Sequence, residues 1–402
     1  MRNKKIIPIL LSILFILNPL KVFAANQSKI VGLDDNVKAY IIGNEKTGEI
    51  YYEKNSDQSY PMASLSKLMT YLLVKEEIDA GNISLDDQVE VDPEASKFNS
   101  WEYSALGLKE GEIFTIRELL EGLIVASGND CAYQLAITVA DSEAEFARNM
   151  TMKASELGLK SQIYYNSSGV ETENGDENSS SASDLLELAQ HIIKKYPEIL
   201  EYGQIREIVD PRRDIDVKST VPLIGEVDGV DGLKTGTTDK AGACLISTVD
   251  MKKLDEKDNF RTIAVVMGAD QKDTRNSVMK DLIYYVSRYY DSKNVLDTNV
   301  AVKSIKTNTV SQGYVDIFPS ENINIIIKDG KNPAIKYNIK DDVKAPINAG
   351  EVLGKATVEY DDKKFDVDLV SKSNYKEASK FSKIFRTSQD FADFVVKLLI
   401  AR

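Results

Sequence analysis

The sequence predicts an α/β (α+β) domain with an antiparallel sheet and a helical subdomain, followed by a small all-β domain and a C-terminal amphipathic helix. Strand-like runs stand on both sides of a long helical region, at residues 38–53 and 232–268, so one antiparallel sheet can join both ends of the domain. From about residue 295, short alternating runs separated by Gly, Pro, Asn and Asp replace helical periodicity. Helical periodicity returns in residues 372–402.

Residues 1–25 have the pattern of a secretory signal peptide. Basic residues precede an apolar run from Ile6 to Leu17, and the small residues Ala24 and Ala25 follow it. This run of 12 residues is short for a membrane span of about 20. We therefore expect cleavage after Ala24 or Ala25, and a protein that works outside the cytoplasm.

The α/β domain is expected over residues 26–294. Residues 38–53 predict a β-hairpin, and a helix with one apolar stripe is predicted to start after Pro61. Thr115 and Glu118 have the spacing of a capping box at the start of a further helix. The other elements expected here are helices at 131–140, 142–157, 182–195 and 274–290, and strands at 232–236, 243–250 and 262–268.

Residues 295–371 predict a small β-sandwich, with strand-like runs at 314–318, 323–327, 356–360 and 365–370. In residues 372–402, seven Lys/Arg stand against three Asp/Glu. On a helical wheel the large apolar residues share one half of the circumference: Phe381, Ile384, Phe385, Phe391, Phe394, Val395, Leu398 and Leu399. Such a helix fits an anionic membrane surface; the alternative is a terminal helix docked on its own β domain.

Charge and composition exclude several classes of function. The net charge is −13, and because residues 1–25 hold four basic and no acidic residues, the rest of the chain carries −17. A chain with so large a negative charge is a poor candidate for nucleic-acid binding. One histidine and two cysteines give no metal cluster, and no cofactor is expected. Cys131 and Cys244 could pair outside the cytoplasm, but each lies in an apolar stretch, which favours two buried free thiols.

Three short motifs carry candidate chemistry. Ser64 and Lys67 stand one turn apart at a helix start, where a desolvated lysine amine could activate the serine hydroxyl. Ser127-Gly128-Asn129 follows at a helix break, and Lys234-Thr235-Gly236 at a predicted strand. Other copies of each motif occur, but only this set has the order helix start, helix break, strand.

In this order the motifs resemble those of the low-molecular-mass penicillin-binding proteins, the serine-type D-Ala-D-Ala carboxypeptidases. The similar stretches are Pro61–Thr70, Ser127–Asp130, residues 231–238 and 241–245, Met150–Gly158, residues 166–170, and the β-domain stretch from Lys344 to Gly354. The resemblance implies a β-lactamase/transpeptidase-like fold, removal of the terminal D-Ala from peptidoglycan stem pentapeptides, and acylation by β-lactams.

The resemblance also implies a role for each matching residue. Ser64 is the nucleophile, Lys67 its base, and Ser127 a proton carrier. The implied substrate-binding residues are Asn129, Lys234, Thr235, Gly236 and Thr237. No metal ligand is implied.

Two departures from the family pattern lie near the expected cleft. Asn178-Ser-Ser-Ser-Ala stands where a histidine and a Tyr-Ser-Thr-Ala stretch are common, and Lys218-Ser219-Thr220 replaces an Asn-rich run. These two departures affect the expected details of substrate binding rather than the type of reaction. The alternatives are a D,D-endopeptidase, a β-lactamase, and a non-catalytic sensor of penicillin or peptidoglycan.

Overall fold

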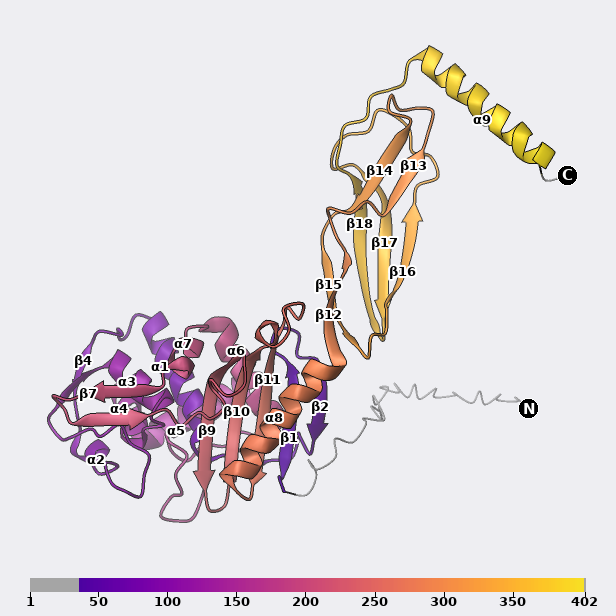
Figure 1. Ribbon diagram of the computed structural model, residues 1–402. Helices are drawn as coiled ribbons and strands as arrows, with labels where there is room; N and C mark the ends of the chain where they lie inside the picture. The colour runs from indigo at the N-terminus through magenta and orange to yellow at the C-terminus, as the bar shows by residue number, and fades with distance from the viewer. Residues whose placement is uncertain (1–35, 401–402) are drawn as a thin grey trace, which may run out of the picture.

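The computed structural model describes residues 36–400, so the expected signal peptide lies outside the described residues. A mixed helix-and-sheet domain forms one end of the molecule, and an elongated β domain extends away from it (Figure 1). A single helix stands at the far end of the β domain. The α/β fold class, with a second all-β domain and a terminal helix, is confirmed.

A five-stranded antiparallel sheet organises the catalytic domain. Its order is β2-β1-β11-β10-β9, so strands from the two ends of the domain meet in one sheet, as expected. The register pairs Ile41 with Val265, and Lys234 with Ile246. The strands are β1 (Ala39–Asn44), β2 (Ile50–Lys54), β9 (Val230–Thr238), β10 (Gly242–Asp250) and β11 (Arg261–Ala269). Strand β9 is an edge strand of this sheet.

Helices cover both faces of the sheet. Successive side chains of a strand point to opposite faces: Ile41 joins the core beneath the helical subdomain, whereas Ile42 joins the core beneath α8. Helix α8 (Lys272–Tyr289) lies across one face (Figure 1). The opposite face carries α1 (Lys67–Asp79), α2 (Pro93–Ser96), α3 (Ile116–Ile124), α4 (Asn129–Val139), α5 (Glu143–Glu156), α6 (Ala182–Lys195) and α7 (Ile199–Gln204). Short strand pairs complete this domain: β3 (Tyr60–Pro61) with β6 (Ser179–Ser180), and β4 (Gln88–Glu90) with β5 (Ile113–Thr115).

The start of α1 differs from the sequence prediction. Ser64 was expected in the first turn of an α-helix, but it lies in a 3₁₀ turn, η1 (Ala63–Ser66), and α1 begins at Lys67. Ala63 has a positive φ of 49°, which is uncommon for a non-glycine residue. Gly169 packs against this turn so closely that a Cβ there would lie 2.0 Å from the Ala63 carbonyl oxygen. Tertiary packing therefore sets the geometry of the turn that carries Ser64.

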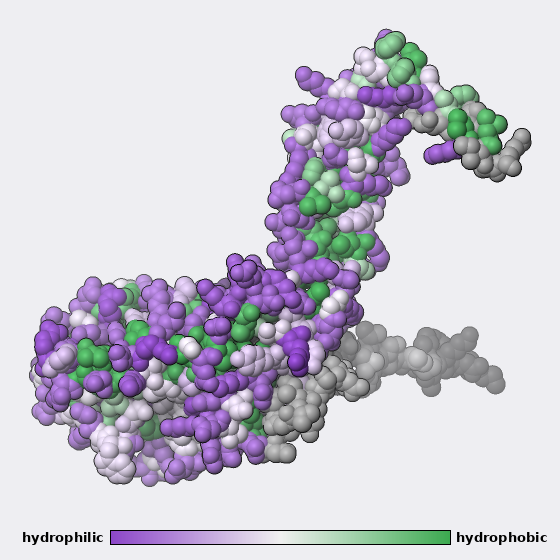
Figure 2. Space-filling view, viewed as in Figure 1, coloured by the Kyte–Doolittle hydropathy of each residue, from purple (hydrophilic) through white to green (hydrophobic). Residues whose placement is uncertain are grey.

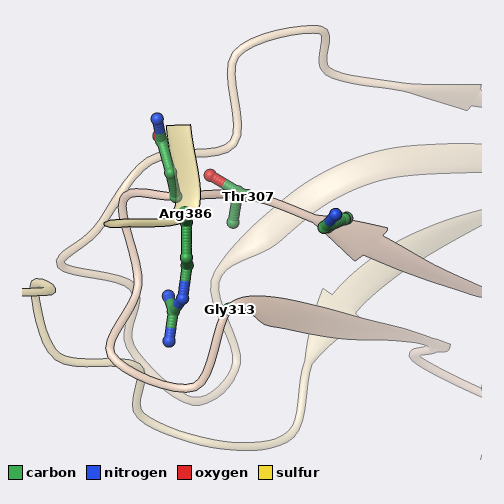
Figure 3. A pocket seen from close by; sticks show the side chains of 5 residues that line it. Thr307, Gly313 and Arg386 are labelled. Atoms are coloured by element: carbon green, nitrogen blue, oxygen red, sulfur yellow. The ribbon is translucent and has the colours of Figure 1, made fainter. Parts of the chain in front are cut away.

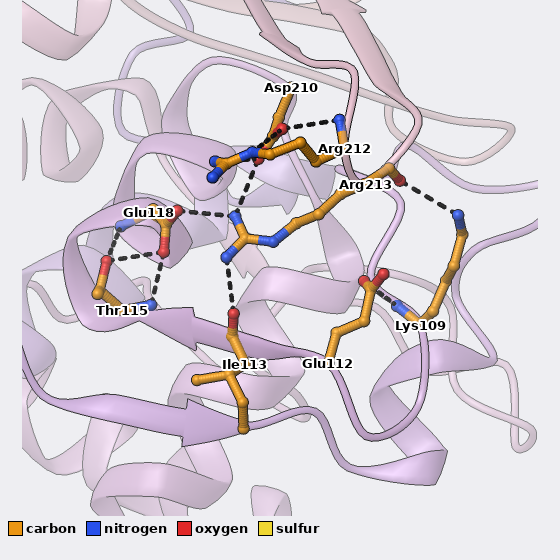
Figure 4. Close-up of polar contacts among 8 residues, drawn as sticks. All are labelled: Lys109, Glu112, Ile113, Thr115, Glu118, Asp210, Arg212 and Arg213. Carbon is orange, nitrogen blue, oxygen red and sulfur yellow. Dashed lines mark hydrogen bonds and ion pairs between the residues drawn. The ribbon is translucent and has the colours of Figure 1, made fainter.

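A hairpin that the sequence analysis did not predict, β7 (Glu207–Asp210) with β8 (Ile215–Lys218), leads back toward β9. Figure 4 shows its turn held against α3. The Arg213 guanidinium donates to Glu118 Oε1 at 2.8 Å and to the Ile113 carbonyl at 2.8 Å. The same Glu118 carboxylate closes the predicted capping box with Thr115. The ion pair between Arg213 and Glu118, with the hydrogen bond to the Ile113 carbonyl, thus holds the hairpin that leads into residues 219 and 220.

The β domain has its own core. Its main sheet has the order β13-β14-β18-β17-β16, and β12 pairs with β15 in a separate ribbon. Helix α8 runs directly into β12, and the Tyr290 hydroxyl donates to the Tyr51 carbonyl of the catalytic domain. The strands are β12 (Tyr290–Leu296), β13 (Lys303–Lys306), β14 (Tyr314–Pro319), β15 (Ile323–Lys328), β16 (Ala334–Ile339), β17 (Val352–Tyr360) and β18 (Lys363–Ser371).

The predicted terminal helix is present as α9 (Lys380–Ile400). Polar contacts join its first turns to the β domain: the Arg386 guanidinium donates to the Val310 and Ser311 carbonyls, each at 2.7 Å. Figure 3 shows Arg386 beside Gly313 and Thr307, at a cavity of about 310 Å³. The large apolar side chains of α9 that the structure describes are exposed: Phe381, Ile384, Phe385, Phe391, Val396 and Leu399. Figure 2 shows green, hydrophobic atoms on this helix. Among the described residues, no helix has the length and apolar character needed to cross a bilayer.

Candidate active site

Ser64 and Lys67 contact each other where η1 passes into α1. Lys67 Nζ lies 2.8 Å from Ser64 Oγ, within hydrogen-bond reach for a base and its nucleophile. The amine also contacts Asn129 Oδ1 at 2.6 Å and the Ser168 carbonyl oxygen at 2.8 Å. Three acceptors from different segments therefore hold the amine against the serine.

The environment of Lys67 favours its neutral form. The side chain is fully buried, and burial lowers the pKa of the Lys67 ammonium from 10.5 to about 7. The nearby acidic side chains Asp130 and Glu143 act against this shift but do not cancel it. At neutral pH a large share of Lys67 is therefore uncharged and able to accept a proton.

Ser127 and Lys234 form the opposite wall. Lys234 Nζ lies 2.6 Å from Ser127 Oγ and 3.0 Å from the Thr235 carbonyl oxygen. Burial lowers the pKa of Lys234 well below its usual range, and the positive charges of Lys67 and Arg275 lower it further. Ser127 has a positive φ of 57°, a conformation that costs about 1–3 kcal/mol and persists where packing enforces it.

Asp130 holds the Ser127–Asn129 turn in place. Its buried carboxylate accepts the backbone N–H groups of Leu106, Gly107 and Leu108 at 2.9–3.0 Å, and that of Cys131 at 2.8 Å. The turn is thereby tied to the 106–108 loop, and Asn129 enters the site at a fixed position. Cys131 is buried and unpaired, as is Cys244, in agreement with the expectation of two free thiols.

Strand β9 brings its edge against the Ser64 turn. A Cβ on Gly236 would lie 2.8 Å from the Met62 carbonyl oxygen and 3.0 Å from Ser64 N, so only glycine fits at this approach. The Thr237 hydroxyl donates to the Gly236 carbonyl at 2.8 Å. The Thr235 hydroxyl donates to Thr220 Oγ1 at 3.0 Å, so Thr220, from the divergent 218–220 stretch, is part of the same wall.

All eight residues expected from the sequence lie in or beside this one site. One hydrogen-bonded group contains Ser64, Lys67 and Asn129. A second group contains Ser127, Lys234 and Thr235. Gly236 on β9 lies against the Ser64 turn and so brings the two groups together. The sequence analysis assigned no role to Ser168 or Asp130. Asp130 follows the Ser127 motif directly, which is the one local signal that could have singled it out.

The folded domains and this arrangement of serines and lysines define a class, the serine acyl-transfer enzymes of penicillin-binding type. Comparison with known proteins agrees. The sequence profile described as D-alanyl-D-alanine carboxypeptidase matches residues 24–271, and that described as the C-terminal domain of penicillin-binding protein 5 matches residues 290–377. The chain belongs to the D-alanyl-D-alanine carboxypeptidase family of serine peptidases.

Individual relatives extend over most of the chain. It is 32% identical to the D-alanyl-D-alanine carboxypeptidase DacF of Bacillus subtilis over 371 residues, which cover 90% of this chain and 92% of the relative. The crystal structure of a peptidoglycan synthesis regulatory factor, PBP3 of Streptococcus pneumoniae, is 27% identical with a TM-score of 0.68, covering 84% of this chain and 99% of that one. The ampicillin-bound penicillin-binding protein D2 of Listeria monocytogenes is 29% identical with a TM-score of 0.54, covering 62% and 96% respectively.

Proposed function

We propose that Ser64, Lys67 and Ser127 carry out the carboxypeptidase reaction on the terminal D-Ala-D-Ala bond of peptidoglycan stem pentapeptides. The observation that carries this proposal is the contact of a fully buried, low-pKa Lys67 amine with Ser64 Oγ at 2.8 Å. Neutral Lys67 takes the hydroxyl proton as Ser64 attacks the scissile carbonyl carbon. The backbone N–H groups of Ser64 and Thr237 hold the oxyanion.

The second group of residues completes the reaction. Ser127, paired with Lys234 at 2.6 Å, passes a proton to the leaving D-alanine amine, and water then hydrolyses the acyl-enzyme. The terminal carboxylate binds at Lys234, Thr235 and Thr237. Its negative charge favours the ammonium form of Lys234 and so works against the effect of burial. Asn129 Oδ1 already contacts Lys67, which leaves its amide NH₂ to bind a carbonyl of the stem peptide.

The same groups would accept a β-lactam in place of the dipeptide. The relative from Listeria monocytogenes has been crystallised in an ampicillin-bound form, which supports penicillin acylation of Ser64 here. A D,D-endopeptidase, a β-lactamase and a penicillin or peptidoglycan sensor are the competing functions, and each predicts a different set of products.

Mass spectrometry of the chain from residue 26, incubated with a muropeptide pentapeptide and then with benzylpenicillin, separates these functions. Loss of one alanine and a stable penicilloyl adduct on Ser64 are expected. An adduct without alanine release would leave an endopeptidase or a sensor. Rapid release of hydrolysed penicillin would make the protein a β-lactamase.

We also propose that the chain is exported and held by α9 at the outer face of the cytoplasmic membrane, in the cell wall space. The proposed parts are a signal peptide (1–25), a catalytic domain (26–294), a β-sandwich (295–371) and a membrane-associating helix (372–402). Exposure of the aromatic side chains Phe381 and Phe391 supports the last of these, with 79% and 68% of their surface accessible. Binding to vesicles of anionic phospholipid tests it.

A further inference from the structure

An acidic loop, residues 171–177, adjoins the C-terminal end of β9. Its four acidic residues are Glu171, Glu173, Asp176 and Glu177. Two lysines approach the same region: Lys240 Nζ lies 2.5 Å from Glu171 Oε1, and Lys38 donates to the Lys240 carbonyl at 3.0 Å. The region therefore keeps an excess of negative charge at the edge of the candidate active site.

Glu177 is the member of this loop that touches β9. Its side chain is 92% buried, since only 8% of the residue is exposed. Oε2 accepts the Thr238 hydroxyl at 2.8 Å, whereas Oε1 is buried and has no hydrogen-bond partner among residues 36–400. Buried polar atoms are nearly always paired, so an unpartnered carboxylate oxygen beside the candidate substrate strand needs a donor.

The proposed reaction fixes the direction of a bound peptide along β9. The terminal carboxylate binds at Lys234 and Thr235, and the scissile carbonyl faces Thr237. The peptide therefore runs antiparallel to β9, and the residue before the two alanines comes opposite Thr238, because an extended chain advances about 3.3 Å per residue. Its side chain is then next to Glu177.

We infer that Glu177, with the surrounding acidic loop, forms a subsite for a free amino group on the side chain of the third stem-peptide residue, as a diamino acid carries. An ammonium group supplies the donor that Oε1 lacks and offsets the negative charge of the loop. This inference rests on the proposed function, since the direction of the peptide follows from the proposed carboxylate and oxyanion contacts.

Two peptides that differ only in the amine provide the test. Nα-acetyl-L-lysyl-D-alanyl-D-alanine keeps a free ε-amine, and Nα,Nε-diacetyl-L-lysyl-D-alanyl-D-alanine has it blocked. We expect kcat/KM of the full chain from residue 26 to be about tenfold higher for the free amine, as for a charge-assisted hydrogen bond. The ratio should fall as salt is raised from about 50 to 500 mM, because Glu171, Glu173 and Asp176 of the surrounding acidic loop are exposed and their charge is screened by salt.

Variants test whether Glu177 causes the preference for the peptide with the free amine. Glu177→Gln should reduce the ratio of the two kcat/KM values to near one, while Glu173→Gln, an exposed acid of the same loop, should keep it. Thr238→Val removes the hydrogen bond to Oε2 and should reduce the ratio without removing the carboxylate. A penicilloyl adduct on Ser64 reports that each variant is folded.

The outcomes separate this inference from the proposed function. Release of alanine from neither peptide would overturn the proposed function. Release from both at equal kcat/KM by the unmodified chain would leave that function standing and overturn the amine subsite. A preference that survives both Glu177→Gln and Thr238→Val would also overturn the assignment to Glu177.

Discussion

In the catalytic cleft the side chains of Lys67 and Lys234 are completely buried, whereas on α9 the apolar side chains of Phe381 and Leu399 are 79% and 68% exposed. Lysine is almost never fully buried, and large apolar groups gathered on a surface mark a site of interaction. In the candidate active site, hydrogen bonds with three segments of the chain offset the free-energy cost of burying the Lys67 amine. On α9 most of the surface of Phe381 and Leu399 remains exposed to solvent, so the comparison favours chemistry at the buried lysines and an interaction surface on the tail.

The largest expected effect comes from removing the proposed nucleophile, Ser64. Ser64→Ala should abolish alanine release and covalent penicillin labelling, with a loss of at least about 10⁴-fold in kcat, because the bond-forming atom is gone. Quenched-flow assays and mass spectrometry of the adduct measure it. Ser277→Ala, in a second Ser-x-x-Lys motif on α8, is the matched control, and labelling that survives Ser64→Ala would disprove the assignment.

The next effect concerns the buried amine. Lys67→Arg keeps the positive charge but supplies a guanidinium that does not lose its proton, so acylation should slow by about 10³-fold. In the unmodified chain the proposed active form is neutral Lys67. With a pKa of about 7, the acylation rate should rise about tenfold per pH unit below pH 7 and level off above it. Stopped-flow acylation by a chromogenic cephalosporin between pH 5 and 9 measures this profile, and a flat profile would contradict it. Lys280→Arg on α8 is the control.

A smaller effect is expected at the tail, where catalysis should be untouched. Deleting residues 380–402 removes the exposed apolar side chains of α9, so sedimentation with anionic vesicles should weaken at least tenfold while alanine release is retained. Phe381→Glu should weaken binding more than Ser382→Glu, which adds the same charge one residue along the helix. Sedimentation unchanged by the deletion would exclude α9 as the anchor.

The smallest effect is expected at the hydrogen bond between Thr220 and Thr235. Thr220→Val removes the 3.0 Å hydrogen bond to Thr235, worth about 0.5–1.5 kcal/mol. We expect a roughly three- to tenfold increase in KM for the peptide with little change in kcat, because Thr235 belongs to the proposed carboxylate site rather than to the reacting atoms. Steady-state kinetics check this, and Thr298→Val in the β domain serves as control.

The parts of the site that are local in sequence could be predicted. Ser64 and Lys67 are one turn apart, the Thr115 capping box spans four residues, and Gly128 interrupts the helical pattern directly. Their physical causes act over a few residues, so a sequence pattern records them. The antiparallel sheet could be predicted for the same reason, since each strand has its own apolar pattern.

The features that could not be predicted from the sequence depend on contacts between distant segments of the chain. The Ser168 carbonyl that binds Lys67 is a backbone group, and no side chain marks it. Arg213 fixes the β7–β8 hairpin through Glu118, 95 residues earlier in the chain. The 3₁₀ turn at Ser64 follows from packing against Gly169. None of these partners can be recognised before the chain is folded.

The close approach of Gly236 to the Ser64 turn has a consequence for drug resistance. An enzyme that is inhibited by a β-lactam can become resistant through a substitution whose side chain clashes with the drug but not with the substrate. At position 236 this route is closed, because any Cβ would collide with Met62 O and Ser64 N before it reached a ligand. A substitution there would displace Ser64, the proposed nucleophile, so a variant that gained resistance at this position would lose its activity on the substrate.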